Sequence, residues 1–163
     1  MKEILAKLVE GKDLTKEEAM KAQELILTGQ ATEAQIACFL TALRMKGETL
    51  DEITGLAAVL RNKANTISPK VKDYVDFVGT GGDCTYSFNI STTSAFVVAA
   101  AGLPVAKHGN RSISSKSGAG DVLEALGVNI SADPAVVEKC VETVGIGFMF
   151  APHFNPAMKY VGP

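Results

Sequence analysis

Residues 74–83 read YVDFVGTGGD, an apolar segment that runs directly into a glycine-rich turn. Tyr74 to Val78 has the aromatic and β-branched composition of a strand. Glycines that follow a strand let the backbone bring its N–H groups close to a ligand. A second polar stretch, KHGNRSISSKSG, covers residues 107–118. We expect the two stretches to meet at one edge of a sheet.

A helix is predicted between these two stretches, opening at residues 91–94, STTS. Its body, AFVVAAA at residues 95–101, is apolar on all sides and is therefore predicted to be buried. The first turn of a helix has unpaired N–H groups, and its dipole favours anions. Lys107, Arg111 and Lys116 add three cations. So many donors suit two phosphate groups on one ligand.

Each of these features has a simpler interpretation when it is taken alone. The glycines can form an ordinary turn, Ser91 can be only a helix cap, and the serine-rich basic stretch can be a solvated linker. Their closeness in the chain favours a ligand site.

The same segments resemble the anthranilate phosphoribosyltransferases of tryptophan biosynthesis, which belong to a wider class that includes the pyrimidine nucleoside phosphorylases. The similarity extends over the whole chain, and the most specific part is the basic stretch. The segments that carry it are residues 79–83, 88–92, 107–115 and 121–127.

The resemblance implies transfer of the phosphoribosyl group from phosphoribosyl pyrophosphate to the amine of anthranilate. It also implies Mg²⁺ as cofactor, with the Ser91 hydroxyl as one metal contact, and Gly79 and Asn110 as contacts to anthranilate. No catalytic residue is assigned. The substrate-binding residues that it implies are Gly79, Gly82, Asp83, Ser87, Asn89, Ile90, Ser91, Thr92, Lys107, His108, Gly109, Asn110, Arg111, Ser112, Ile113, Ser114 and Ser115.

The chain departs from the family in two respects. Ala119-Gly120 stands where the family usually has a serine and then an alanine, which removes one hydroxyl from the sugar-phosphate site. The chain also ends at Pro163, roughly halfway along a family member. The family's acidic metal-binding pair and the arginine that meets the anthranilate carboxylate lie beyond that point. We therefore expect the 163-residue chain to be inactive alone.

Residues 1–66 are predicted to form a helical domain. Thr15-x-x-Glu18, Thr32-x-x-Gln35 and Thr49-x-x-Glu52 are three capping boxes, and Gly29 and Gly47 are predicted to end helices. The fourth helix has a predicted core-facing stripe of Ile53, Leu56, Ala57 and Leu60. The resemblance implies that this domain forms homodimer contacts and part of the cleft wall.

Residues 67–72 contain Pro69 and are predicted to be a hinge. Residues 73–163 then alternate between strand and helix patterns, which predicts part of an α/β domain with a mainly parallel sheet. The patterns after the first strand and helix are a strand at 104–106, helices over 121–126 and from Asp133, and a buried strand at 146–151.

Composition limits the other possibilities. The net charge of −2 gives no general attraction to nucleic acid or to a membrane, and no apolar run is long enough to span a bilayer. Three widely spaced cysteines form no metal motif, so we expect a cytoplasmic protein. His153 is predicted to be structural, and His108 to shape the pocket.

Three alternatives remain open at this point: a pyrimidine nucleoside phosphorylase, a non-catalytic nucleic-acid-binding paralogue, and a module that acts only in assembly. The basic stretch matches the transferases better than the phosphorylases. The net charge of −2 disfavours the nucleic-acid-binding paralogue.

Overall fold

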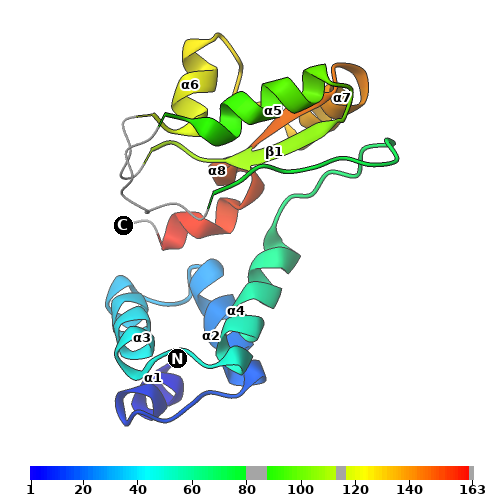
Figure 1. Cartoon of the computed structure of the whole chain (residues 1–163). Helices are drawn as coiled ribbons and strands as arrows, with labels where there is room; N and C mark the ends of the chain where they lie inside the picture. Colours follow the sequence, from blue (N-terminus) through cyan, green and yellow to red (C-terminus); the bar gives the residue numbers. More distant parts are fainter. Residues whose placement is uncertain (80–87, 113–116, 162–163) are drawn as a thin grey trace. The chain divides into compact units, whose positions relative to one another are not determined.

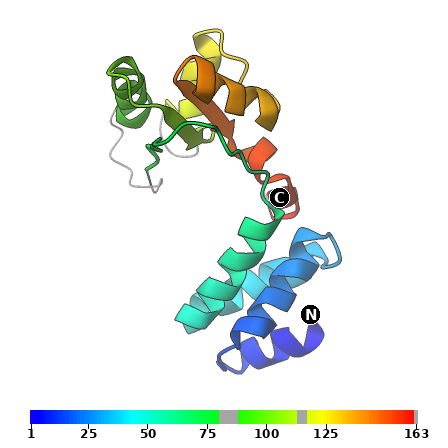
Figure 2. The same cartoon turned by 90° about the vertical axis from the view of Figure 1, so that its right-hand side faces the viewer.

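The computed structural model describes residues 1–79, 88–112 and 117–161, and it forms two compact units (Figures 1 and 2). The first unit contains Met1–Ala64 and the segment that begins at Asn155, and the second is Asn65–Phe154. A helical bundle followed by an α/β unit with a parallel strand pair confirms the predicted fold class. The predicted hinge at residues 67–72 stays a prediction.

The helices of the first unit begin where the sequence places their caps. Each of Thr15, Thr32 and Thr49 accepts a hydrogen bond from the backbone N–H three residues later, and the side chain of that residue accepts one from the threonine N–H. All three predicted capping boxes are thus confirmed. Gly29 and Gly47 follow α2 and α3 with φ of 71° and 87°, which favour glycine. The helices are α1 (Lys2–Val9), α2 (Lys16–Leu27), α3 (Glu33–Lys46) and α4 (Leu50–Lys63).

The buried face of α4 differs from the predicted stripe. Ile53 is 54% exposed, whereas Glu52, Gly55 and Val59 are buried. The reason is the close approach of α2, because a Cβ atom on Gly55 would lie only 2.5 Å from the carbonyl oxygen of Lys16. Leu56 and Leu60 are partly buried beside the core. The backbone contact, rather than the large side chains, sets how α4 is turned.

The second unit is built on two parallel strands. Their register pairs Val105 with Ile146 and Gly109 with Phe150. Figures 1 and 2 show α5 on one side of this strand pair and α7 on the other. The elements are α5 (Ile90–Ala100), β1 (Val105–Gly109), α6 (Ala119–Ala125), α7 (Pro134–Thr143), β2 (Ile146–Phe150) and α8 (Ala151–Phe154).

The predicted first strand is shorter in the structure than in the sequence pattern. Val75 makes a single parallel bridge to Val105, through hydrogen bonds with Pro104 and Ala106. After this bridge, the carbonyl of Phe77 accepts a hydrogen bond from the Lys107 side chain instead of a strand partner. The predicted strand over residues 74–78 is therefore wrong in extent.

The predicted burial of the α5 body is only partly right, and the apolar residues of α7 are also divided between buried and exposed positions. On α5, Thr92 and Ala95 are buried but Val97 is 64% exposed, because the main packing partners of α5 are the two strands on one of its sides. On α7, Val137 and Val141 pack inward while Val136 and Val144 are exposed. An apolar sequence predicts burial only where neighbouring elements supply a partner.

Within the second unit, the segment that follows Asn65 is held to α7 by two hydrogen bonds. The N–H groups of Ser68 and Lys70 donate to the carboxylates of Glu138 and Glu142, both at 2.7 Å. In the first unit, the short helix η1 (Pro156–Tyr160) packs on α2. None of the helices that the structure describes has both the length and the apolar character to cross a membrane.

Candidate functional site

The first turn of α5 is capped by Asn89 rather than by a serine. Its Oδ1 accepts a hydrogen bond from the N–H of Thr92 at 3.1 Å, and its Nδ2 donates to the carbonyl of Ser117 at 3.4 Å. The side chain that caps α5 thus also links this helix to the basic stretch. Because Asn89 is the cap, Ser91 lies in the first turn of the helix and is partly exposed.

The basic stretch begins as a strand, since Lys107, His108 and Gly109 complete β1. Lys107 is only 3% exposed, and its Nζ donates hydrogen bonds to the carbonyls of Phe77 and His108. Burial lowers the pKa of Lys107, and the charge of Asp76 opposes that effect. Asp76 Oδ1 also accepts the N–H of His108 at 3.0 Å. The end of β1 is therefore fastened to the residues that precede Gly79.

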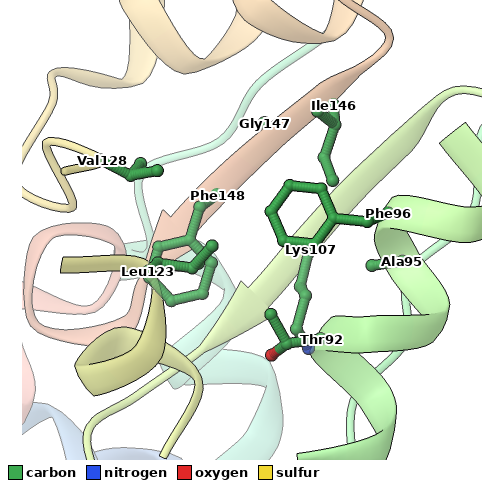
Figure 3. Close-up of a pocket in the computed structure, with 9 residues that line it drawn as sticks. All are labelled: Thr92, Ala95, Phe96, Lys107, Leu123, Val128, Ile146, Gly147 and Phe148. Atoms are coloured by element: carbon green, nitrogen blue, oxygen red, sulfur yellow. The ribbon is translucent and has the colours of Figure 1, made fainter. Parts of the chain in front are cut away.

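A cavity of about 150 Å³ lies between α5, the strands and α6, and Figure 3 shows the Lys107 side chain running toward Thr92 within it. The Thr92 hydroxyl and His108 Nε2 are buried without a hydrogen-bond partner among the described residues. The cavity is otherwise largely apolar. Its lining residues are Thr92, Ala95, Phe96, Lys107, Leu123, Val128, Ile146, Gly147 and Phe148.

The charge of Arg111 is already paired within the protein. Its two terminal nitrogens bind the two carboxylate oxygens of Glu124 at 2.7 and 2.9 Å, and Nη1 also reaches Asp121 Oδ1 at 3.3 Å. The guanidinium lies 5.8 Å from the ring centroid of Phe150. Arg111 holds the pKa of Glu124 below its ordinary value. Hydrogen bonds lower the pKa of Asp121. The largest effect comes from the backbone N–H of Ser112, and smaller ones come from the Arg111 side chain and the backbone N–H of Gly118.

The described members of the predicted site come from three places in the unit. Gly79 follows the Val75 bridge, residues 89–92 open α5, and residues 107–112 follow from β1. The Asn89–Ser117 and Lys107–Phe77 hydrogen bonds bring these places together. The predicted residues outside the described ranges are Gly82, Asp83, Ser87, Ile113, Ser114 and Ser115.

Three acidic residues near the site are absent from the sequence-based set: Asp76, Asp121 and Glu124. Asp76 lies inside the strand pattern of residues 74–78, and the other two lie inside residues 121–127, DVLEALG, one of the segments that carry the family resemblance. Sequence could have indicated them only as acidic positions, because their partners, His108 and Arg111, are set by the fold.

The described residues do not by themselves make a magnesium site. They contain no group of three or more His, Cys, Asp or Glu side chains that could hold a metal ion. Ser91 offers one hydroxyl oxygen, whereas protein-bound Mg²⁺ usually has one or two carboxylate ligands as well as waters and substrate phosphates.

Two family descriptions match this chain. The helical bundle domain of the glycosyl transferase family matches residues 2–64, and the a/b domain of that family matches residues 71–163.

Similar proteins of known name agree with these matches. Anthranilate phosphoribosyltransferase of Acetivibrio thermocellus is 59% identical over all of this chain and 48% of its own length, and that of Streptococcus sanguinis is 55% identical over all of this chain and 49% of its length. The chain spans about half the length of the curated relatives that it matches.

Solved structures of the same name are also similar. The crystal structure of the Thermus thermophilus enzyme matches 98% of this chain and 49% of its own, with 41% identity and a TM-score of 0.88. The Saccharomyces cerevisiae enzyme in complex with PRPP and Mg matches 98% of this chain and 48% of its own, with 28% identity and a TM-score of 0.85.

Proposed function

We propose that this chain carries the phosphoribosyl-binding part of an anthranilate phosphoribosyltransferase. The chain belongs to the glycosyl transferase family, because it matches both the helical bundle domain and the a/b domain of that family. The names of relatives at 59% and 55% identity support this assignment. The reaction would give N-(5-phosphoribosyl)anthranilate, an intermediate of tryptophan biosynthesis.

The proposed chemistry replaces one bond at C1 of the ribose. The bond from C1 to the pyrophosphate oxygen breaks, C1 becomes cation-like, and the amine nitrogen of anthranilate attacks the opposite face and loses a proton. Negative charge develops on the leaving pyrophosphate, so the protein contributes mainly positioning and electrostatic stabilisation. The positive end of the α5 dipole and Lys107 at the end of β1 suit that charge. No residue of the chain is assigned to move the proton.

The observation that carries the proposal is the meeting of α5 with the basic stretch. Asn89 caps the helix through the N–H of Thr92 and donates to Ser117, so the anion-favouring end of α5 faces the residues that follow β1. A chain that used these segments only as linkers would not need a shared side chain between them.

The proposed cofactor and partners follow the same assignment. Mg²⁺, bound when the donor is bound, would neutralise pyrophosphate charge, and Ser91 would contribute one hydroxyl to it. Support comes from the yeast relative, whose structure was solved in complex with PRPP and Mg. We propose Gly79 and Asn110 as anthranilate contacts, a homodimer formed through the N-terminal helices, and a cytoplasmic location.

Calorimetric titration of phosphoribosyl pyrophosphate with Mg²⁺ into the 163-residue chain tests the donor site. We expect saturable binding that weakens at least tenfold in Lys107→Met, which keeps most of the length of the side chain but removes its charge. Lys139→Met is the matched control, because Lys139 is exposed on α7, and it should bind as the unchanged chain does. Absence of binding by folded chain would contradict the proposal for this chain.

The choice of ligand distinguishes the proposed transferase from a pyrimidine nucleoside phosphorylase. A pyrimidine nucleoside phosphorylase would bind inorganic phosphate with a pyrimidine nucleoside in preference to phosphoribosyl pyrophosphate. That preference, measured in the same titration, would replace the proposed function.

A further inference from the structure

One carboxylate on α6 gathers two separate parts of the basic stretch. Asp121 Oδ2 accepts the backbone N–H of Ser112 at 2.9 Å and that of Gly118 at 3.2 Å. Asn110 is held to the same helix, because its carbonyl accepts the N–H of Gly120 at 3.0 Å. The start of α6 thus fixes the backbone on both sides of this stretch.

Glu124, one turn further along α6, holds the Arg111 side chain. The pairing is bidentate, with two N–H···O contacts at 2.7 and 2.9 Å, which fixes both the position and the plane of the guanidinium. The contact of Arg111 with the Phe150 ring places the same group against β2.

We propose that Asp121 and Glu124 are positioning residues of the phosphoribosyl site, and that Arg111 serves as a strut between α6 and the basic stretch rather than as a direct phosphate ligand. This inference rests on the proposed function, since it says how that site is held in place.

The charge balance supports the strut role. One guanidinium faces two carboxylates, so the cluster of Arg111, Asp121 and Glu124 has a formal charge of −1 and gives no net attraction to an incoming phosphate. A direct contact would require Arg111 to leave a bidentate partner. The backbone donors and Lys107 would then carry more of the anion binding.

The backbone is also packed closely at this point. A Cβ atom on Gly118 would lie 2.1 Å from the nitrogen of Ser112 and 2.6 Å from Asp121 Oδ2. Only glycine fits at such a short distance. The backbone at Gly118 can therefore lie against the backbone at Ser112, and the Asp121 carboxylate binds both.

A double-mutant cycle separates a strut from a phosphate ligand. The affinity for phosphoribosyl pyrophosphate with Mg²⁺ is measured in Arg111→Gln, in Glu124→Gln and in the double variant. A strut predicts that each single variant loses about tenfold in affinity and that the double variant loses little more, because both changes break the same pair. Glu10→Gln, which breaks an exposed ion pair with Lys12 in the helical unit, is the control.

A direct ligand predicts the opposite sign for one variant. Glu124→Gln would release Arg111 toward the phosphate, so binding would stay equal or tighten, while Arg111→Gln alone would weaken it. That pattern, or additive losses in the double variant, would overturn the proposal.

A second measurement needs no ligand and therefore separates failure of this inference from failure of the proposed function. Hydrogen exchange of the Ser112 and Gly118 amides should accelerate about tenfold in Asp121→Asn, because a neutral amide oxygen is the weaker acceptor. Amides of α2 should keep their rates. If the unchanged chain binds no phosphoribosyl pyrophosphate, this measurement decides alone, and unchanged exchange at both amides overturns the inference.

Discussion

Glu52 is a fully buried carboxylate, and both of its oxygens accept hydrogen bonds. Its side chain is 0% exposed, and it accepts the N–H of Leu14 at 2.8 Å, the N–H of Thr49 at 2.8 Å and the Nζ of Lys46 at 3.0 Å. One capping residue thus joins α4 to the loop before α2 and to the end of α3. Hydrogen bonding and Lys46 lower the pKa of Glu52 even though burial opposes this.

Glu52→Gln should therefore destabilise the chain by about 2–3 kcal/mol, because it leaves Lys46 without a buried counter-charge and turns one acceptor into a donor beside N–H groups. Urea unfolding followed by circular dichroism measures the change. Glu10→Gln, on an exposed ion pair, should stay within about 0.5 kcal/mol. Equal effects of the two substitutions would contradict the role given to Glu52.

At the scale of elements, the contact between α2 and α4 depends on a missing side chain. Replacing a glycine by alanine inside a helix ordinarily stabilises it by about 1 kcal/mol. Gly55→Ala should do the reverse and lower the melting temperature by several degrees, because the new Cβ would lie 2.5 Å from the backbone oxygen of Lys16 in α2, so that the two helices would have to move apart. A raised melting temperature would show that the two helices can separate at little cost.

Some features of a helix can be predicted from its own sequence, and others depend on a neighbouring element. The three capping boxes were predictable because a threonine and the residue three positions later meet whenever a helix starts there. The packing of Gly55 against α2 was not, because it depends on a partner from another helix. The Ile53 stripe failed for this reason, as did the burial of α5.

Prediction of the site divides in the same way. Asn89 and Lys107 were identified through resemblance, and the structure brings both to the meeting point of α5 and β1. The pairing of Arg111 with Glu124 was not predicted, since sequence shows the charges but not the turn that lets them meet. The basic stretch predicts Arg111 as a ligand for phosphate, and this stays a prediction, while in the structure its guanidinium faces two carboxylates.

For the whole molecule, acid should weaken both units. The pKa values of Glu18, Glu52, Asp121 and Glu124 are all lower in the folded state. The unfolded chain therefore binds these protons more tightly, so the stabilisation is complete above the ordinary carboxyl pKa and is lost as the pH falls through the folded values. The melting temperature should be nearly constant from about pH 6 to 8 and fall steadily from about pH 5 to 3. An unchanged melting temperature at pH 3 would contradict these shifts.

The proposed homodimer also belongs to this scale. Met45 is 83% exposed and lines a groove between α1 and α3 together with Val9, Ala42 and others. If the N-terminal helices form the dimer, Met45→Glu should shift the sedimentation equilibrium toward monomer by tenfold or more, because it would bury a charge. Lys21→Glu changes an exposed position on α2 and should leave the equilibrium unchanged. If the unsubstituted chain is a monomer at all concentrations, the proposed homodimer is wrong.

The parallel pairing of β1 with β2 has a consequence for the order of folding. Val105 and Ile146 are paired in the sheet but are separated in the sequence by α6 and α7. The helices of the bundle, in contrast, follow one another closely in the sequence. Contacts between residues distant in the chain cost more loop entropy and form more slowly. The bundle should therefore acquire protection from exchange before the strands do during refolding, and α5, which packs on those strands, should be protected no earlier than they are.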